Sequence, residues 1–255
     1  MNDPGGPLDG PPGPYRRHGP ISPSQAMHDS PRRPVIVSPP ETCLAAAAAL
    51  HDRDGHMVVA HYGSVPGEIA VCMKSVGLAD HSDYGVLELR ADREPLDRAL
   101  VARFGDPPLA VGSARRLHHV WYLRMDAHHT LLVGPHAALA SRPAAGRGRD
   151  RSDLPHRDIR ASLAIIGIVG PRATRLLAAA GLPGKLPIGA IGAVTGDPSI
   201  VAILRENQRR YLVLVRAHDA DALWGHLLTA GEPLGAAFVG YDALTLLHAS
   251  SIPGG

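Results

Sequence analysis

The sequence predicts an α+β fold, because one strand–helix unit occurs three times and a hairpin lies between two of its copies. Each unit is a strand pattern, a short polar turn and a helix that ends in Gly-x-Pro. The units are "GVLELRADREPLDRALVARFGDP", "LAIIGIVGPRATRLLAAAGLP" and "RYLVLVRAHDADALWGHLLTAGEP", and the hairpin is "VWYLRMDAHHTLLV". Strand–helix units mixed with hairpins are typical of a sheet with helices on one face.

The helices of the three units are predicted from their apolar stripes and their ends. We expect Gly105, Gly181 and Gly231 to take the left-handed conformation after each helix, and the proline two positions later to block its continuation. Apolar residues at helical spacing place one face of each helix in the core. These residues are Leu96, Leu100 and Phe104, then Leu176, Leu177 and Ala180, then Ala220, Leu223, Trp224, Leu227 and Leu228.

Two further helices are expected before the first unit. In "SPPETCLAAAAAL", Ser38 as N-cap, Pro39 in the first turn and Glu41 three residues after the serine form a capping box. They predict a helix over 39–50. The stretch "VPGEIAVCMKSVG" predicts another short helix that stops at Gly77.

The ends and the middle of the chain differ in composition from the units. The first forty residues hold eleven of the 24 prolines, so we expect residues 1–37 to form a disordered tail, with an ordered arm as the alternative. Residues 38–255 are expected to form one domain. Residues 141–158 contain five arginines and predict a solvated linker between two halves, although an anion or nucleic-acid contact is the other interpretation.

Composition excludes several classes of partner. Apolar residues make up 45% and charged residues 20%, which is ordinary for a globular protein, and the formal net charge of +2 is too small to indicate a nucleic-acid partner. No apolar run approaches the roughly 20 residues of a membrane helix, and we identify no signal peptide. Cys43 and Cys72 have no metal-site or disulfide spacing, which suits a reducing cytoplasm. We therefore expect a cytoplasmic protein without nucleic-acid or membrane partners.

A polar cluster precedes the first unit in "VGLADHSDYGVLELRAD", residues 76–92. Asp80 and Ser82 are side chains that readily close a turn through bonds to nearby backbone groups. We expect them to form the turn that enters the strand, and we do not interpret them as a reacting pair.

Three stretches in order resemble the folate-binding aminomethyltransferase family, whose best-known member is the glycine-cleavage T-protein. The cluster is similar to the family's V-G-L-x-D-x-S-x-x-G, with Asp80, Ser82 and Gly85 matching. "LAIIGIVGPRATRLL" is similar to L-x-G-P-x-A-x-x-L-L. "DALWGHLLTAGEPLGAAFVGYDALTLLHAS" is similar to A-x-x-L-W-x-x-L-L-x-A-G and the segment behind it, with Asp242 matching. The resemblance runs from about residue 55 to the end of the sequence, where the family's C-terminal barrel would begin.

The resemblance implies a fold of two intertwined ferredoxin-like halves, sheet plus helices, around a central folate-sized opening. It also implies a place in one-carbon metabolism, with tetrahydrofolate as cofactor and transfer of a one-carbon unit to or from its N5. Such a transferase needs an acid near the reacting nitrogens and a carboxylate that pairs with the edge of the pterin.

The sequence departs from the family where that chemistry would lie. Leu117-His118-His119 stands in place of an acidic pair. "LRENQRR" replaces a glycine-rich stretch; Gln208 is the more direct counterpart of its carboxylate, and Glu206 could take that place only by a register shift. The other departures are Pro135 in place of an asparagine and Tyr241 in place of an arginine.

Candidate site residues follow from these positions. His118 is the candidate catalytic base, because an imidazole titrates near neutral pH; His118 and His119 would point to opposite faces on a strand, or both could be solvated strand-entry residues. Tyr84 and Tyr122 could stack on folate or another planar small molecule, or serve only as core-edge aromatics. The remaining candidate binding residues are Glu206, Gln208 and Tyr241. A metal site at His128-His129 with Asp126 lacks a further ligand, so no metal is predicted.

Two functions are consistent with the sequence. One is a tetrahydrofolate-dependent aminomethyl or one-carbon transferase with a rebuilt site. The other is a catalytically inert subunit or assembly factor, similar to the gamma subunit of sarcosine oxidase, with a larger oxidoreductase subunit as its partner. The lost carboxylates and the missing barrel favour the second. The iron–sulfur assembly branch is disfavoured because its Lys-Gly-Cys motif is absent.

Overall fold

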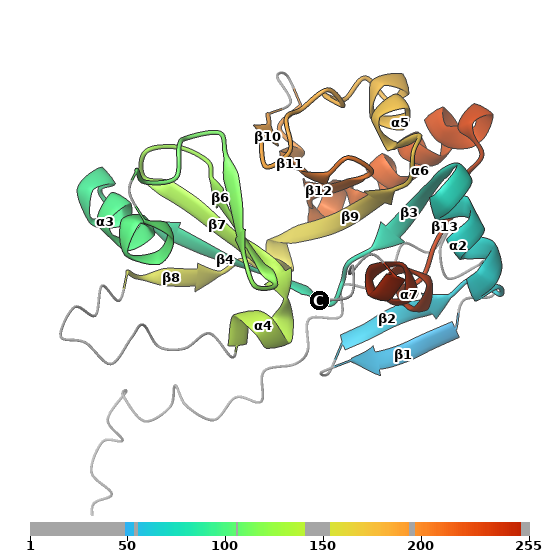
Figure 1. Cartoon of the computed structure of the whole chain (residues 1–255), viewed down its shortest axis with the longest axis horizontal. Coiled ribbons are helices and arrows are strands. Elements are labelled where there is room, and N and C mark those ends of the chain that lie inside the picture. The colour runs from blue at the N-terminus through green and yellow to red at the C-terminus, as the bar shows by residue number, and fades with distance from the viewer. Residues whose placement is uncertain (1–48, 54–55, 106, 141–153, 194–196, 251–255) are drawn as a thin grey trace, which may run out of the picture. The chain divides into compact units, whose positions relative to one another are not determined.

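The computed structural model describes residues 49–53, 56–105, 107–140, 154–193 and 197–250 (Figure 1). They form a mixed α+β fold, as predicted, with a six-stranded sheet, a five-stranded sheet and a two-stranded ribbon. The ribbon pairs β1 (Ala49–Arg53) with β2 (His56–His61). The predicted tail and most of the helix predicted over 39–50 lie outside the described residues. Ala49 and Leu50, expected in that helix, belong to β1 because they pair with β2.

The five-stranded sheet has the order β5-β6-β7-β4-β8, and all its pairs are antiparallel. The predicted hairpin is confirmed as β6 and β7. Helix α3 (Arg93–Phe104) follows β4, and the short helix α4 (His136–Ala140) follows β7. The strands are β4 (Tyr84–Arg90), β5 (Ala114–Leu117), β6 (Val120–Arg124), β7 (His129–Pro135) and β8 (His156–Asp158).

The six-stranded sheet has the order β10-β11-β12-β9-β3-β13, and only the β13–β3 pair is parallel. Helix α5 (Ala173–Ala179) follows β9, and α6 (Ala220–Gly231) follows β12. The strands are β3 (Val76–Asp80), β9 (Leu163–Val169), β10 (Ile191–Gly192), β11 (Ile200–Asn207), β12 (Arg210–Arg216) and β13 (Ala236–Phe238). Short 3-10 turns span Arg160–Ser162, Ala217–Asp219 and Glu232–Leu234.

Two copies of one module build these sheets. The first half is β4-α3-β5-β6-β7-α4 and the second is β9-α5-β10-β11-β12-α6, with matching strand orders β5-β6-β7-β4 and β10-β11-β12-β9. Of the three strand–helix units in the sequence, two begin the modules, as β4-α3 and β9-α5. The third ends the second module, as β12-α6. The modules meet at two adjacent segments, where the Ala114 amide donates to the Gly189 carbonyl and the Ile191 amide to the Gly112 carbonyl, at 2.6 and 2.9 Å.

One apolar cluster joins the two sheets, and we name it the inter-sheet core. It combines residues of the five-stranded sheet with residues of the six-stranded sheet. Its buried members are Val86, Trp121, Leu123, Leu131, Val133, Leu163, Ile165, Ala202, Leu204, Leu212 and Leu214. The free energy gained by hydrophobic burial is roughly proportional to the apolar area removed from water. This core therefore contributes the main attraction between the halves.

Helices cover the outer faces of the sheets. Leu96 and Leu100 of α3 pack on the five-stranded sheet, and Leu176, Leu223 and Trp224 of α5 and α6 pack on the six-stranded sheet. Trp224 is only 1% exposed, as its predicted helix face requires. The expectation of helices on one face only is wrong for the six-stranded sheet. Beside β3, its other face contacts α2 (Val65–Lys74) and α7 (Tyr241–Ser250).

Some predicted boundaries are confirmed and others are wrong. Gly105 and Gly181 have φ of +84° and +72° and follow their helices, as predicted. Gly231 has φ of −89°, because the chain continues into a 3-10 turn and Gly235 takes the left-handed conformation instead, with φ of +65°. A Cβ at Gly231 would lie 2.4 Å from that of Ala236, so close packing requires this glycine.

Two more corrections come from strand pairing. Helix α2 ends at Lys74 and not at Gly77, because Val76 begins β3 and Gly77 pairs with Val169 of β9. Within the predicted linker, residues 156–158 form β8 and pair with β4; residues 141–153 lie outside the described part of the chain. None of the described helices is long and apolar enough to cross a membrane.

Candidate functional site

Residues 81–83 carry the chain from one sheet to the other, because β3 belongs to the six-stranded sheet and β4 to the five-stranded sheet. The Tyr84 amide donates to the His81 carbonyl at 3.0 Å, and the Ser82 hydroxyl donates to the Met57 carbonyl at 3.2 Å. Burial raises the pKa of Asp80 to about 6, and hydrogen bonding from Ser82 opposes that rise. The expected turn is present, and the Ser82 hydroxyl ties it to β2 of the ribbon.

A polar group lies beside this turn, and we name it the seam cluster: the buried side chains of His81, Trp121, Glu206 and Arg210, with the more exposed His248 at its edge. Arg210 Nε lies 2.6 Å from Glu206 Oε2, and both side chains are under 10% exposed. Trp121 Nε1 donates to Glu206 Oε1 at 2.7 Å. Since Trp121 is on β6 and Glu206 on β11, this carboxylate connects the two halves.

Two imidazoles complete the partners of Arg210. Its Nη2 donates to His81 Nε2 at 3.2 Å, and its Nη1 donates to His248 Nε2 at the end of α7. Burial, and then the Arg210 guanidinium, lower the pKa of His248 to about 4. His248 is therefore neutral at neutral pH and can accept this bond. His81 Nδ1 lies 3.6 Å from Asp83 Oδ1.

Tyr84 lies against the seam cluster. Its ring is 4.4 Å from the His81 ring, with an interplanar angle of 38°. Burial raises the pKa of Tyr84 to about 12, so that its phenol keeps its proton at neutral pH. The structure thus brings together two of the candidates from the sequence, Tyr84 and Glu206.

The other candidate binding residues are not members of the seam cluster. Tyr122 is on the opposite face of its strand from Trp121, where its ring meets Phe104 edge-on at 4.9 Å. Gln208 is exposed in the β11–β12 turn. Tyr241 begins α7 and lies under the Arg53 guanidinium, 3.9 Å from its ring centre.

His118 and His119 are not on a strand. Leu117 pairs with Val120, so the two histidines form the loop of the β5–β6 hairpin, and His118 has φ of +53°. The arrangement on opposite faces of a strand therefore does not apply, and the two histidines fit the alternative, solvated residues at the entry of a strand. Both side chains are exposed to solvent.

Metal-ligating side chains do not gather in the part of the chain that the structure describes, where no group of three or more could hold an ion. His129 instead pairs with Glu88, with Nε2 and Oε1 3.1 Å apart. Burial, and then the Glu68 carboxylate, raise the pKa of Cys72 to about 11, so this thiol is a poor nucleophile.

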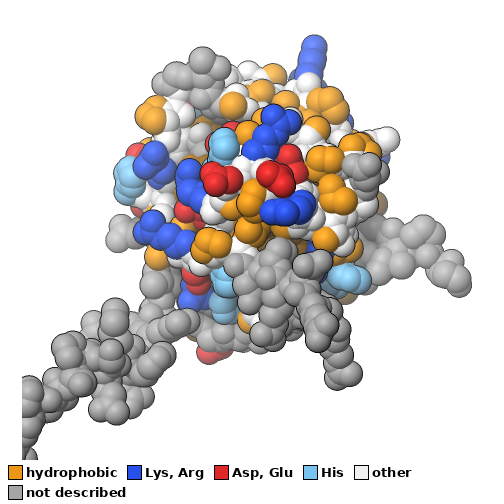
Figure 2. Space-filling view, turned by 90° about the vertical axis from the view of Figure 1, so that its left-hand side faces the viewer, with side chains coloured by type: hydrophobic (Ala, Val, Ile, Leu, Met, Phe, Trp, Pro, Cys, Tyr) orange, Lys and Arg blue, Asp and Glu red, His pale blue; other side chains and the backbone are white. Residues whose placement is uncertain are grey.

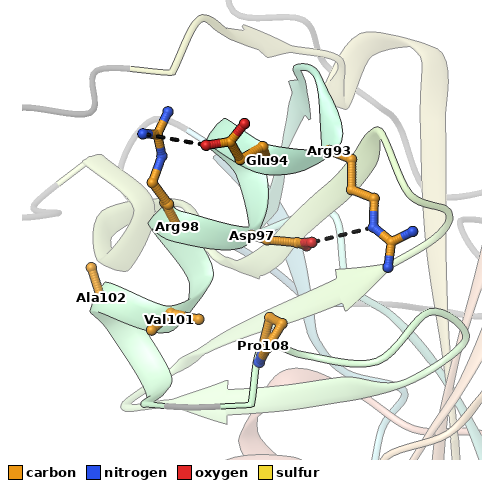
Figure 3. A pocket seen from close by; sticks show the side chains of 7 residues that line it. All are labelled: Arg93, Glu94, Asp97, Arg98, Val101, Ala102 and Pro108. Atoms are coloured by element: carbon orange, nitrogen blue, oxygen red, sulfur yellow. Dashed lines mark hydrogen bonds and ion pairs between the residues drawn. The ribbon is translucent and has the colours of Figure 1, made fainter.

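A surface hollow of about 650 Å³ lies beside α3 (Figure 3). No residue of the seam cluster lines it. Its charges are already paired within the helix, Arg93 with Asp97 at 3.4 Å and Arg98 with Glu94 at 3.7 Å. Figure 2 shows this side of the protein, with basic and acidic side chains next to one another among hydrophobic ones. The remaining lining is Val101, Ala102 and Pro108.

Sequence reasoning missed His81, Trp121, Arg210 and His248. A signal existed for one of them: Arg210 begins β12 and shares the face of Leu212 and Leu214, which belong to the inter-sheet core. An arginine on an inward face needs a partner, and Glu206 across the turn is the nearest acid in the sequence.

The comparisons with known proteins concern structure alone. Neither a protein-family model nor a curated protein matches the chain. Among solved structures, it is similar to the glycine cleavage system aminomethyltransferase T from Bartonella henselae, with 18% identity and a TM-score of 0.64, over 80% of this chain and 58% of that one. It is also similar to heterotetrameric sarcosine oxidase from Corynebacterium sp. U-96, with 19% identity and a TM-score of 0.48, over 64% of this chain and 87% of that one. The resemblance inferred from the sequence is thus confirmed for the fold: this chain has the fold of a part of aminomethyltransferase T.

Proposed function

We propose that this protein is a divergent protein of the folate-binding aminomethyltransferase fold that acts in one-carbon metabolism as a catalytically inert subunit or assembly factor of a larger oxidoreductase. The observation that carries the proposal is the state of Glu206. One of its oxygens accepts from Trp121 and the other pairs with Arg210, so the carboxylate is committed within the protein.

A transferase site needs a carboxylate that is free to act on the ligand. To engage a pterin or a developing cation, Glu206 would have to leave Arg210, a buried guanidinium that would lose its charge partner. Separating a buried pair typically costs about 3–5 kcal/mol. His118, the other candidate, is an exposed loop residue, and an imidazole does not supply a fixed negative charge.

The catalytic part of the proposal is tested in an aminomethyltransferase assay with an aminomethylated lipoyl carrier and tetrahydrofolate. We expect no methylene-tetrahydrofolate above background, with an aminomethyltransferase T as positive control. Loss of one preorganised electrostatic group costs about two to three orders of magnitude in rate. Robust turnover that His118→Ala abolishes would overturn the proposal and make His118 the catalytic residue.

The partner part is tested by co-expression with the flavin-containing subunits of a sarcosine oxidase from the same source, followed by size-exclusion chromatography. We expect one complex that contains the chain and raised recovery of the flavin-loaded partner. Elution as separate species at micromolar concentration, with unchanged flavin content, would contradict a subunit or assembly role.

Tetrahydrofolate binding is a second candidate function, favoured by one observation. Tyr84 and Glu206 were assigned to a folate site from separate stretches of sequence, and they lie in the same region, both acting with Arg210. Calorimetric titration with tetrahydrofolate tests it. Binding that Tyr84→Leu removes and Tyr241→Leu leaves intact would support a folate site at the seam cluster; absence of heat at millimolar ligand would refute it.

A further inference from the structure

Three segments of the second half converge at Gly170, the residue that follows β9 (Figure 1). The Gly170 amide donates to the Arg209 carbonyl in the β11–β12 turn at 2.8 Å, and the Arg172 amide donates to the Ser75 carbonyl behind α2 at 3.2 Å. A Cβ at Gly170 would clash with that Ser75 oxygen, so the close approach requires glycine. The end of α2, the start of α5 and the β11–β12 turn therefore lie side by side.

Basic side chains come from all three segments, and we name them the basic patch: Lys74, Arg172, Arg175, Arg205 and Arg209. Arg205 is placed beside α5 by its neighbour Tyr211. Its guanidinium is 5.6 Å from the centre of the Tyr211 ring, and the Tyr211 hydroxyl is 2.7 Å from Thr174 Oγ1 in the first turn of α5. Arg205 and Arg209 both belong to "LRENQRR", the stretch that replaces a glycine-rich one.

The charges of the basic patch are not matched by acids. Among the described residues, no carboxylate lies within ion-pair distance of any of its members. Arg172 Nη1 donates to the Leu234 carbonyl at 2.9 Å, and Arg205 Nη1 donates to the Leu186 carbonyl at 2.6 Å. These two bases thus have hydrogen bonds but no counter-charge. Glu232 is exposed in the 3-10 turn that contains Leu234, yet it forms no ion pair with the patch.

Helix stability does not explain the two arginines at the start of α5. Arg172 is the N-cap residue, Arg175 lies in the first turn, and that turn contains no acidic residue. A cation at the start of a helix is opposed by the positive end of the helix dipole. Lys74, in contrast, lies in the last turn of α2, where a cation is favourable. The arginines therefore add positive charge to the patch at a cost to their own helix.

We propose that the basic patch is the docking surface for an acidic segment of a protein partner, a run of Asp and Glu side chains. The charges are complementary, and a guanidinium fits a carboxylate through two parallel N–H bonds. Nucleic acid is a poorer match, since the formal net charge of the chain is only +2. The inference rests on the proposed subunit or assembly role, and it deepens that role by naming the surface and the chemistry of the contact.

The test is fluorescence anisotropy of a labelled deca-glutamate peptide titrated with the full chain at low ionic strength, with deca-lysine and a single-stranded decadeoxynucleotide as comparison probes. The variants are Arg209→Glu and Arg175→Glu, because both side chains are exposed. Arg216→Glu is the matched control: Arg216 is also exposed, but it lies at the other end of β12. Circular dichroism checks that each variant keeps its melting temperature.

We expect deca-glutamate to bind, the oligonucleotide to bind more weakly and deca-lysine not to bind. Arg209→Glu and Arg175→Glu should each weaken peptide binding about fivefold, and Arg216→Glu by less than about twofold. Absence of peptide binding, tighter binding of the oligonucleotide, or equal losses in Arg209→Glu and Arg216→Glu would overturn the proposal.

The peptide titration needs no oxidoreductase subunit, so its outcome is separate from the co-expression test of the proposed function. Without a complex in co-expression, the subunit role fails while the titration still decides whether the patch binds acidic polypeptide. A complex that forms equally well with Arg209→Glu and with the wild type would show that the partner docks elsewhere, and it would overturn the proposal without affecting the subunit role.

Discussion

Each half of the protein buries one arginine beside its last hairpin, and the two arginines point in opposite directions. Arg124 of β6 shares the face of Tyr122 and reaches α3, where its Nη2 donates to Asp97 Oδ1 at 2.8 Å. Arg210 of β12 shares the face of Leu212 and reaches His81, between the two sheets, and His248 of α7. The first arginine attaches a helix to its own sheet, whereas the second belongs to the junction of three elements. Both arginines are buried, so burial does not distinguish them. They differ in the face of the strand on which each side chain lies.

The largest effect is expected in the second half, where α6 covers the sheet and the shorter α4 of the first half does not have an equivalent of Trp224. Trp224→Ala should lower the free energy of unfolding by about 3–5 kcal/mol, the usual cost of removing a large buried aromatic. Urea denaturation followed by circular dichroism measures it. Wild-type stability would contradict the packing of α6 on the six-stranded sheet.

The next effect separates the two arginines. Arg210→Met should cost about 3 kcal/mol, because it leaves the Glu206 carboxylate buried without its charge partner. Glu206→Leu combined with Arg210→Met should recover most of that loss, since replacing a whole buried pair by apolar residues is often neutral. A double-mutant cycle in urea gives the coupling energy. A coupling near zero would mean that the pair contributes nothing to the junction of the halves.

A third effect depends on pH and tests the turn that joins the sheets. The folded pKa of Asp80, about 6, is above its unfolded value of 3.8, so the folded state favours the protonated carboxyl. Its cost to stability is absent below about pH 4, grows as pH rises through 6 and is complete near pH 8. Asp80→Asn should therefore stabilise the protein by about 3 kcal/mol at pH 8 and by less than about 1 kcal/mol at pH 4.

Asp83→Asn is the control for that experiment, because Asp83 contributes to the same turn but lies beside His81. It should show a much smaller gain at high pH than Asp80→Asn, because the Asp83 charge is a minor cause of the raised pKa of Asp80 and burial is the main one. Thermal unfolding from pH 4 to pH 8 measures both variants. A stabilisation by Asp80→Asn that is equal at pH 4 and pH 8 would show that the ionised carboxylate is not the cause.

The elements that depend on local pattern were predictable from the sequence, and those that depend on a distant partner were not. The apolar faces of α5 and α6 were predicted because helical periodicity is a property of neighbouring residues. Ala49 and Leu50 were assigned to a helix because pairing with β2 is not visible in an alanine-rich stretch. Gly231 was given the left-handed position because its contact with Ala236 depends on how the chain turns afterwards.

The site was predictable only in part, for the same reason. Tyr84 and Glu206 were found from the resemblance, but the bond between Glu206 and Trp121 requires the stacking of two sheets. Tyr122 was named as a stacking residue and Trp121 was not considered, although strand alternation puts these neighbours on opposite faces. The sequence did not say which of the two faces meets the other half.

The smallest effect is expected for Arg124→Met, and it completes the comparison. Arg124 is 2% exposed, and its Nε and Nη1 are buried without a hydrogen-bond partner among the described residues. Burying an unsatisfied donor costs about 1–3 kcal/mol, and methionine removes that cost while it fills a similar volume. The Asp97 left behind is 26% exposed and keeps the exposed Arg93 as its neighbour, so solvent can hydrate it. We therefore expect a loss of less than about 1 kcal/mol in urea, against about 3 kcal/mol for Arg210→Met. Equal losses for the two variants would show that the direction of a buried arginine does not determine its contribution, and the distinction between the two halves would fail.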